Sequence, residues 1–137
     1  MTNSIETPVV CAIIEKDGMI LAAQRGVNQS NAGLWEFPGG KVHSGETAEQ
    51  ALKREIREEL AVEINIVKQL QPVSYRYPWI FIRLIPFICS ISQGEPVALE
   101  HSQVSFFTRR DCSKILWSPA DIKVMENYWE SVRKDLD

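Results

Sequence analysis

The chain has 137 residues, of which 45% are hydrophobic and 24% are charged. This length fits a single domain over residues 1–137 with a real core, and the composition is typical of a globular protein rather than a disordered one. The formal net charge of −3 provides no broad basic surface, which disfavours extended nucleic-acid binding. A small anionic ligand would need a metal ion to offset the acidic charge.

The cysteines and the apolar segments indicate a cellular compartment. The three cysteines are widely spaced and form no C-x-x-C pair, which favours reduced, buried thiols. Residues 1–8 lack the basic start and apolar stretch of a signal peptide, and no run reaches the roughly 18 apolar residues of a membrane-spanning helix. We therefore expect a cytoplasmic protein that binds no membrane, either as a monomer or as a homodimer.

Hydrophobic periodicity and turn residues predict strands interleaved with two helices. Asp17-Gly18 lies between two β-rich runs and predicts a tight hairpin, because both residues tolerate positive φ. The polar stretch 26–33 predicts a loop, and Pro38-Gly39-Gly40 predicts a break. In chain order, the predicted elements are strands over 9–15, 19–24 and 34–37, a helix over 47–60, strands over 62–66, 73–77, 79–92 and 103–108, and a helix over 121–134.

The helix over 47–60 has the clearest local signals. Thr47 and Gln50 form a capping box, and apolar residues recur at helical spacing up to Leu60. Pro86 lies inside the long strand over 79–92 and predicts an edge position or a bulge, since proline donates no ladder hydrogen bond. Taken together, these elements predict an α/β fold with a mixed sheet covered by helices.

Three glutamates fall on one stripe of this helix. At about 100° per residue, Glu55, Glu58 and Glu59 lie at roughly 0°, 300° and 40° around the axis, so their carboxylates share one side. Like charges at i,i+4 spacing destabilise an isolated helix by about 0.2–0.5 kcal/mol per pair, and a hard divalent cation would offset this repulsion. The alternative is a solvated acidic face paired with Lys53, Arg54 and Arg57.

The segment before the helix adds groups suited to an anionic ligand. The backbone of Pro38-Gly39-Gly40 can approach a ligand closely and offer a carbonyl to a metal ion. Lys41 adds a positive group where phosphate oxygens would lie. These residues favour a metal and phosphate site over a merely solvated acidic face.

The spacing from Gly40 to Val62 resembles the Nudix box. Six of its seven fixed letters and both of its bulky aliphatic positions are present, and a match of this kind arises by chance about once in ten million starting positions or less often. Residues 35–41 extend the similarity to the MutT-like nucleotide-pool branch, and weaker similarity covers nearly the whole chain. The matching positions are Gly40, Glu46, Arg54-Glu55-Ile56, Glu58-Glu59 and Val62.

One position departs from the pattern, because Ala61 stands where the box has glycine. That glycine would suit a left-handed position that ends the helix, where a Cβ costs about 1 kcal/mol. The change removes no metal ligand. We expect it to alter the turn after Leu60 and the stability of the protein rather than catalysis.

The resemblance implies a Nudix-type α/β/α sandwich, with a mixed β-sheet between helices, and a set of site residues. The implied metal ligands are the Gly39 carbonyl and the carboxylates of Glu55, Glu58, Glu59 and Glu100. The same four glutamates are the implied catalytic residues, and sequence does not choose the proton acceptor among Glu55, Glu58 and Glu100. Gly40, Glu46 and Arg54 would be structural, the last two as a pair that orients the helix. The implied substrate-binding residues are Arg25, Glu36, Phe37, Pro38, Lys41 and Asp121.

Two of these assignments have local alternatives. Glu100 matches by local spacing only, and an ordinary surface glutamate fits that position equally well. Asp121 lies near the predicted helix start at Ser118-Pro119, so a helix N-cap is the alternative to reading the base. His43 and His101 show no zinc-ligand spacing, and both are expected on the surface.

The implied activity is Mg²⁺-dependent hydrolysis, with Mn²⁺ as the alternative ion, of the α–β phosphate bridge in a nucleoside triphosphate. The products would be a nucleoside monophosphate and pyrophosphate. Oxidised dGTP or CTP/dCTP-type nucleotides are the implied substrates, which links the protein to nucleotide-pool sanitation and DNA repair. The alternatives are another diphosphate substrate, such as an RNA 5′ end or a nucleotide sugar, and a noncatalytic MutT-like recognition module, which the intact glutamate set disfavours.

Overall fold

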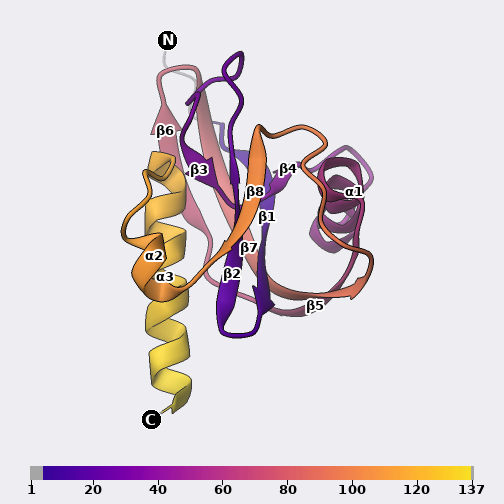
Figure 1. Ribbon diagram of the computed structural model, residues 1–137. Helices are drawn as coiled ribbons and strands as arrows, with labels where there is room; N and C mark the ends of the chain where they lie inside the picture. The colour runs from indigo at the N-terminus through magenta and orange to yellow at the C-terminus, as the bar shows by residue number, and fades with distance from the viewer. Residues whose placement is uncertain (1–4, 137) are drawn as a thin grey trace.

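The computed structural model describes residues 5–136 and consists of a mixed sheet with helices on both faces (Figure 1). The predicted domain, 1–137, also includes residues 1–4 and 137, which lie outside the described range. The strands are β1 (Thr7–Lys16), β2 (Met19–Gln24), β3 (Trp35–Glu36), β4 (Gly39–Lys41), β5 (Glu63–Gln69), β6 (Val73–Tyr77), β7 (Ile80–Gln93) and β8 (Gln103–Phe107). The helices are α1 (Ala48–Leu60), α2 (Arg109–Cys112) and α3 (Pro119–Leu136).

The sheet is built around the parallel pair of β1 and β7. Its main path runs β3-β2-β1-β7-β5, and β4, β6 and β8 pair with β1, β7 and β2 respectively. Every strand pairing other than β1–β7 is antiparallel. Figure 1 shows α1 and α3 on opposite sides of this sheet. The predicted α/β/α sandwich with a mixed sheet is therefore confirmed.

The buried side chains of β1 alternate between two layers of the core, because successive side chains of a strand point to opposite faces of the sheet. Val10, Ala12 and Ile14 pack in the layer that contains the apolar face of α1. Cys11 and Ile13 pack in the layer that contains the buried face of α3. The three cysteines are free and buried, as expected of thiols that pack as small hydrophobes.

Local turn chemistry is confirmed at the first hairpin. Asp17 and Gly18 have φ values of 53° and 77°, and the strands that they join pair in an antiparallel register with Lys16 opposite Met19. Positive φ at both central residues matches the right-handed twist of the strands. The hairpin joins β1 to β2, and β2 in turn pairs with β3 and β8.

The sequence predicted an edge position or a bulge for Pro86; the edge position is wrong, whereas an irregularity of the bulge type does occur in the neighbouring β5–β7 pairing. Strand β7, which contains Pro86, lies between β1 on one side and β5 and β6 on the other. The Pro86 carbonyl accepts the N–H of Leu70 at 2.9 Å. In an antiparallel ladder the N–H and C=O of one residue face the same neighbour, so the missing N–H of Pro86 faces the connection between β5 and β6. A register shift between Ile66 and Lys68 accompanies this junction.

Two short elements differ from the sequence prediction. The predicted break at Pro38-Gly39-Gly40 is only partly correct, because Gly39–Lys41 forms β4 and pairs with β1. Helix α2, over Arg109–Cys112, was not predicted. It begins at Thr108, whose hydroxyl accepts the N–H of Asp111 at 3.2 Å. Both elements are too short to leave a periodic pattern in the sequence.

Candidate active site

The ends of α1 fix which of its side chains face the sheet. At the start, the Thr47 hydroxyl accepts the N–H of Gln50 at 3.1 Å, and the Gln50 side chain accepts the N–H of Thr47 at 2.9 Å. The predicted capping box is thus confirmed. At the end, Ala61 adopts the left-handed conformation with φ 59°, and its N–H donates to the Arg57 carbonyl at 3.0 Å. The helix therefore keeps its length although alanine replaces the motif glycine.

Glu59 is buried at the junction of α1 and β4, with 6% of its surface exposed. Its carboxylate accepts the N–H of Gly39 at 2.8 Å. A Cβ at Gly39 would overlap the carbonyl of Val10 on β1, which explains why the close approach of β4 to β1 requires glycine. Burial, and then repulsion by other carboxylates, raises the pKa of Glu59 to about 9.

Arg54 links the other glutamates of α1. Its guanidinium donates to both carboxylate oxygens of Glu46, at 2.7 and 2.9 Å, and to Glu55 at 2.9 Å. A longer contact of 3.4 Å reaches Glu58, whose side chain is about half exposed. The hydrogen bonds from Arg54 lower the pKa of Glu46 to about 2. The structure thus contains the Glu46–Arg54 pair expected from the sequence.

Gly40 also lies close to a side chain of α1. A Cβ at Gly40 would overlap the carboxyl group of Glu55, so the glycine leaves space for that side chain between β4 and α1. Burial raises the pKa of Glu55, against the opposing effect of Arg54. The two glycines of β4 therefore place one glutamate each, Gly39 by its N–H and Gly40 by its lack of a side chain.

The loop before β8 is attached to the end of the glutamate helix. The N–H groups of Val97 and Leu99 donate to the carbonyls of Leu60 and Glu59, at 2.9 and 3.1 Å. These carbonyls belong to the last turn of α1, where a helix leaves its acceptors unpaired. The attachment brings Glu100 close enough that its charge contributes to the raised pKa of Glu55 and of Glu59. Glu100 is exposed, and we group it with Glu55, Glu58 and Glu59 as the acidic group because its charge reaches Glu55 and Glu59.

The acidic group suits a hard divalent cation in its chemistry. Its donors are carboxylate oxygens, which Mg²⁺ and Mn²⁺ prefer, and the repulsion that raises the pKa of Glu59 is the kind that a bound cation relieves. As the side chains lie, however, no three His, Cys, Asp or Glu residues among those described converge as a metal-binding group. Arg54 holds Glu55 and Glu58, while Gly39 holds Glu59.

A cavity of about 410 Å³ adjoins Glu59. It contains five of the six residues that the resemblance assigns to the substrate: Arg25, Glu36, Phe37, Lys41 and Asp121. Pro38 does not line this cavity. It is fully buried, and its carbonyl accepts the N–H of Ala12 at 2.9 Å. Its place in the structure is in the core, between β3 and β4.

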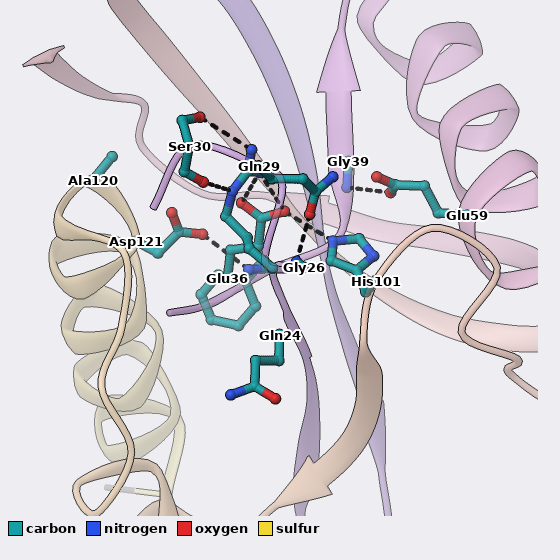
Figure 2. Close-up of polar contacts among 12 residues, drawn as sticks. Gln24, Gly26, Gln29, Ser30, Glu36, Gly39, Glu59, His101, Ala120 and Asp121 are labelled. Atoms are coloured by element: carbon teal, nitrogen blue, oxygen red, sulfur yellow. Dashed lines mark hydrogen bonds and ion pairs between the residues drawn. The ribbon is translucent and has the colours of Figure 1, made fainter. Parts of the chain in front are cut away.

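Glu36 is held in the cavity by two neighbours (Figure 2). Arg25 donates to both of its carboxylate oxygens, at 2.9 and 3.1 Å, and His101 Nε2 lies 2.9 Å from one of them. The expected surface position of His101 is wrong, since only 2% of its side chain is exposed. The expected surface position of His43 is confirmed, with 62% of the side chain exposed.

Asp121 lies at the opposite side of the cavity from α1, in the first turn of α3 (Figure 2). The N-cap alternative does not match the structure, because α3 already begins at Pro119 and the Asp121 carboxylate accepts the N–H of Phe37 at 2.9 Å. Burial, and then the charge of Glu36, raises the pKa of Asp121 well above its usual range. A neutral carboxyl group can both donate and accept hydrogen bonds.

Sequence reasoning missed several residues that line the same cavity, and four of them have aromatic or polar side chains from three separate segments. Tyr77 and Trp79 flank the turn between β6 and β7, Ser118 precedes α3, and His101 follows Glu100. The aromatic residues on either side of Pro78 were the available sequence signal, because a turn rarely needs two large rings. Nothing in the local sequence indicated that His101 would contact Glu36, 65 positions away.

Comparison with known proteins identifies the family. The NUDIX domain family matches residues 6–128. A CTP pyrophosphohydrolase of Escherichia coli (strain K12) is 38% identical over 120 residues, 88% of this chain and 89% of the relative. An 8-oxo-dGTP diphosphatase of Proteus vulgaris is 37% identical over 91 residues, 66% of this chain and 79% of the relative. The solution structure of the E. coli ORF135 protein superposes with a TM-score of 0.79 and 35% identity, covering 91% of this chain and 89% of that one.

The chain belongs to the NUDIX family. Hydrolases of this family generally need a divalent metal ion, which agrees with the oxygen donors gathered around α1. Within residues 5–136, no helix combines the length and the apolar character needed to cross a membrane.

Proposed function

We propose that this NUDIX protein is a metal-dependent nucleoside triphosphate pyrophosphohydrolase. It cleaves the α–β phosphate bridge and releases a nucleoside monophosphate and pyrophosphate. The observation that carries this proposal is the position of the acidic group of α1 beside a cavity that holds Arg25, Glu36 and Asp121. The similarity to a CTP pyrophosphohydrolase over most of both chains supports the same substrate class.

We assign the metal site to Glu55, Glu58, Glu59, Glu100 and the Gly39 carbonyl, with Mg²⁺ as the ion and Mn²⁺ as the alternative. When bound, the ion neutralises phosphate oxygens and stabilises charge on the attacking and leaving oxygens. The chain itself restrains the glutamates, because the Gly39 N–H holds Glu59 and the Arg54 guanidinium holds Glu55. One of Glu55, Glu58 and Glu100 accepts the proton of the attacking water, and pH–rate profiles of their glutamine variants identify which.

We assign Asp121 to the edge of the base. Burial raises the pKa of Asp121, which favours the protonated carboxyl group, and that form presents a donor beside an acceptor. Cytosine presents the complementary pair in N3 and its amino group, and oxidised guanine does so in O6 and the N7–H. Unmodified guanine has two acceptors, N7 and O6, at that edge. This pattern favours CTP, dCTP and oxidised dGTP over dGTP.

The experiment that tests this function uses the purified protein with Mg²⁺ and a panel of substrates. The panel contains CTP, dCTP, dGTP and oxidised dGTP, together with a nucleotide sugar and a 5′-triphosphorylated RNA for the alternative substrates. We expect pyrophosphate and a nucleoside monophosphate as the first products from triphosphates. Initial release of orthophosphate with a nucleoside diphosphate would contradict cleavage at the α–β bridge, and activity confined to the sugar or the RNA would reassign the substrate.

A pair of variants tests the metal assignment. Glu58→Gln should lower kcat by orders of magnitude and leave the fold intact, because the Glu58 side chain is half exposed and makes no short contact. Glu49→Gln is the matched control, since Glu49 is an exposed glutamate in the first turn of the same helix. Near-normal Mg²⁺-dependent activity in Glu58→Gln would remove Glu58 from the metal site.

We further propose the cytoplasm as the compartment. The support is chemical: Cys11, Cys89 and Cys112 are free and buried, which suits a reducing environment. Burial also raises the pKa of each thiol, so the reactive thiolate is disfavoured. Mass spectrometry of the protein alkylated under native conditions should find all three thiols unmodified, and rapid labelling would contradict their protected state.

A further inference from the structure

Among the described residues, three aromatic side chains line the cavity beside Glu59: Phe37, Tyr77 and Trp79. Phe37 has 3% of its surface exposed and packs against Trp117, with ring centroids 5.0 Å apart. Tyr77 is 9% exposed, whereas Trp79 is 55% exposed. Phe37 is one of the substrate-binding residues that the resemblance implies, yet it has little free area for a base. Trp79 has the area that Phe37 lacks.

The ring of Trp79 is held in a defined plane. It stacks on Tyr77 with centroids 4.9 Å apart and an interplanar angle of 15°. Tyr77 is fixed in turn, because its hydroxyl accepts the N–H of Ala120 at 3.0 Å and bonds the side chain of Asn31. One face of the indole is thus covered by a fixed ring, while 55% of the surface of Trp79 stays exposed. A ring oriented before binding loses little entropy when a ligand stacks on it.

This platform adjoins the residue assigned to the base edge. Ala120, which donates to the Tyr77 hydroxyl, directly precedes Asp121. Strand β6, which ends at Tyr77, packs against α3, the helix that contains Asp121. Trp79 and Asp121 line the same cavity, and Tyr77 connects the indole to the first turn of α3.

We propose that the nucleobase of the substrate stacks on the face of Trp79 that points away from Tyr77. This inference rests on the proposed function, because it takes a nucleotide as the ligand. The two contacts divide the recognition of the base. Stacking on Trp79 supplies affinity for any base, since every base has a π face, while Asp121 discriminates between base edges by hydrogen bonds.

The test compares Trp79→Ala, Trp79→Phe and the control Val67→Ala. Val67 is an exposed residue of β5, with 62% of its surface accessible, and it lies outside the cavity. A base stacked on an aromatic ring contributes about 1–3 kcal/mol, so Trp79→Ala should raise KM for CTP and for oxidised dGTP about 5- to 150-fold. The kcat values and the order of preference among bases should stay close to those of the wild type. Trp79→Phe should recover much of the affinity, and the control should change nothing.

A base-free substrate and a binding measurement separate stacking from other roles of Trp79. Ribose 5-triphosphate should be hydrolysed equally well by the wild type and by Trp79→Ala. Equal losses on base-free and base-containing substrates, or an unchanged KM for CTP, would overturn the proposal. A loss of dimer in gel filtration, accompanied by an unchanged KM for CTP, would assign Trp79 to self-association instead.

Calorimetry with α,β-methylene-CTP distinguishes this inference from the proposed function. If the wild type hydrolyses no triphosphate but binds the analogue more tightly than Trp79→Ala does, the proposed function fails while stacking stands. If the wild type hydrolyses CTP but both proteins bind the analogue equally, stacking fails alone.

Discussion

Replacing Glu59 by glutamine removes a buried ionisable group and keeps the shape of the side chain. The amide oxygen of glutamine can still accept the Gly39 N–H, which is 2.8 Å from the carboxylate. The substitution therefore isolates the electrostatic effect of Glu59 from its packing. We expect Glu59→Gln to stabilise the metal-free protein at alkaline pH and to lose Mg²⁺-dependent activity.

The direction of this stability change follows from the pKa of Glu59, which is raised to about 9 from the ordinary 4.5. The folded protein keeps a proton that the unfolded chain releases, so the stability linked to Glu59 is complete below the unfolded pKa and is lost as the pH rises through the folded one. Each pKa unit corresponds to about 1.4 kcal/mol. Because relaxation and water entry offset part of the cost of burying a charge, we expect a loss of about 3 kcal/mol between about pH 5 and pH 9.

The assay is urea unfolding of both proteins at about pH 5 and pH 9, with EDTA present. The difference in unfolding free energy between Glu59→Gln and the wild type should be small in acid and should reach about 3 kcal/mol in alkali. Added Mg²⁺ should stabilise the wild type more than the variant, because a ligand that binds only the folded state raises its stability. A stability difference that is the same at both pH values would refute the buried-charge explanation.

Three further substitutions test the structural supports of the site. Ala61→Gly should raise the unfolding free energy by about 1 kcal/mol in urea titrations, because Ala61 has a φ of 59° that favours glycine. A loss of stability would show that this conformation carries no strain. Gly39→Ala should prevent stable folding, seen as lost near-UV dichroism, since the added Cβ would overlap the Val10 carbonyl; a native spectrum would contradict the close approach. Arg54→Lys should lower kcat at least tenfold with little change in melting temperature, because lysine cannot reproduce the bidentate contact with Glu46. An unchanged kcat would show that Arg54 does not position the helix for catalysis.

The elements that sequence predicted well are those whose cause is local. The hairpin at Asp17-Gly18 and the capping box at Thr47 depend on residues within four positions of each other. The motif glycine indicated a left-handed turn after Leu60, and Ala61 keeps that conformation, although the alanine was expected to alter the turn. In each case, backbone sterics or a nearby side chain decides the conformation, so neighbouring residues are sufficient to infer it.

The features that sequence missed depend on contacts between distant segments. His101 is buried because Glu36 accepts its hydrogen bond across 65 positions, and no local pattern of residues 99–103 indicates this. Pro86 lies inside the sheet because β7 pairs with β1 on one side and with β5 and β6 on the other. The glutamates illustrate both cases: their common stripe on α1 was predicted, whereas the hydrogen bond that buries Glu59 comes from β4.

Glu36 links the two ends of the cavity electrostatically. Its charge is among the causes of the raised pKa of both Glu59 and Asp121, which come from different helices. Arg25 and His101 hold Glu36 in place, so that this charge stays near both groups. Burial is the largest cause of the raised pKa of both groups, and the charge of Glu36 adds to it, because charge interactions strengthen where water is excluded. The acidity of each end is thus a property of the folded arrangement around Glu36, and the Nudix box residues alone do not determine it.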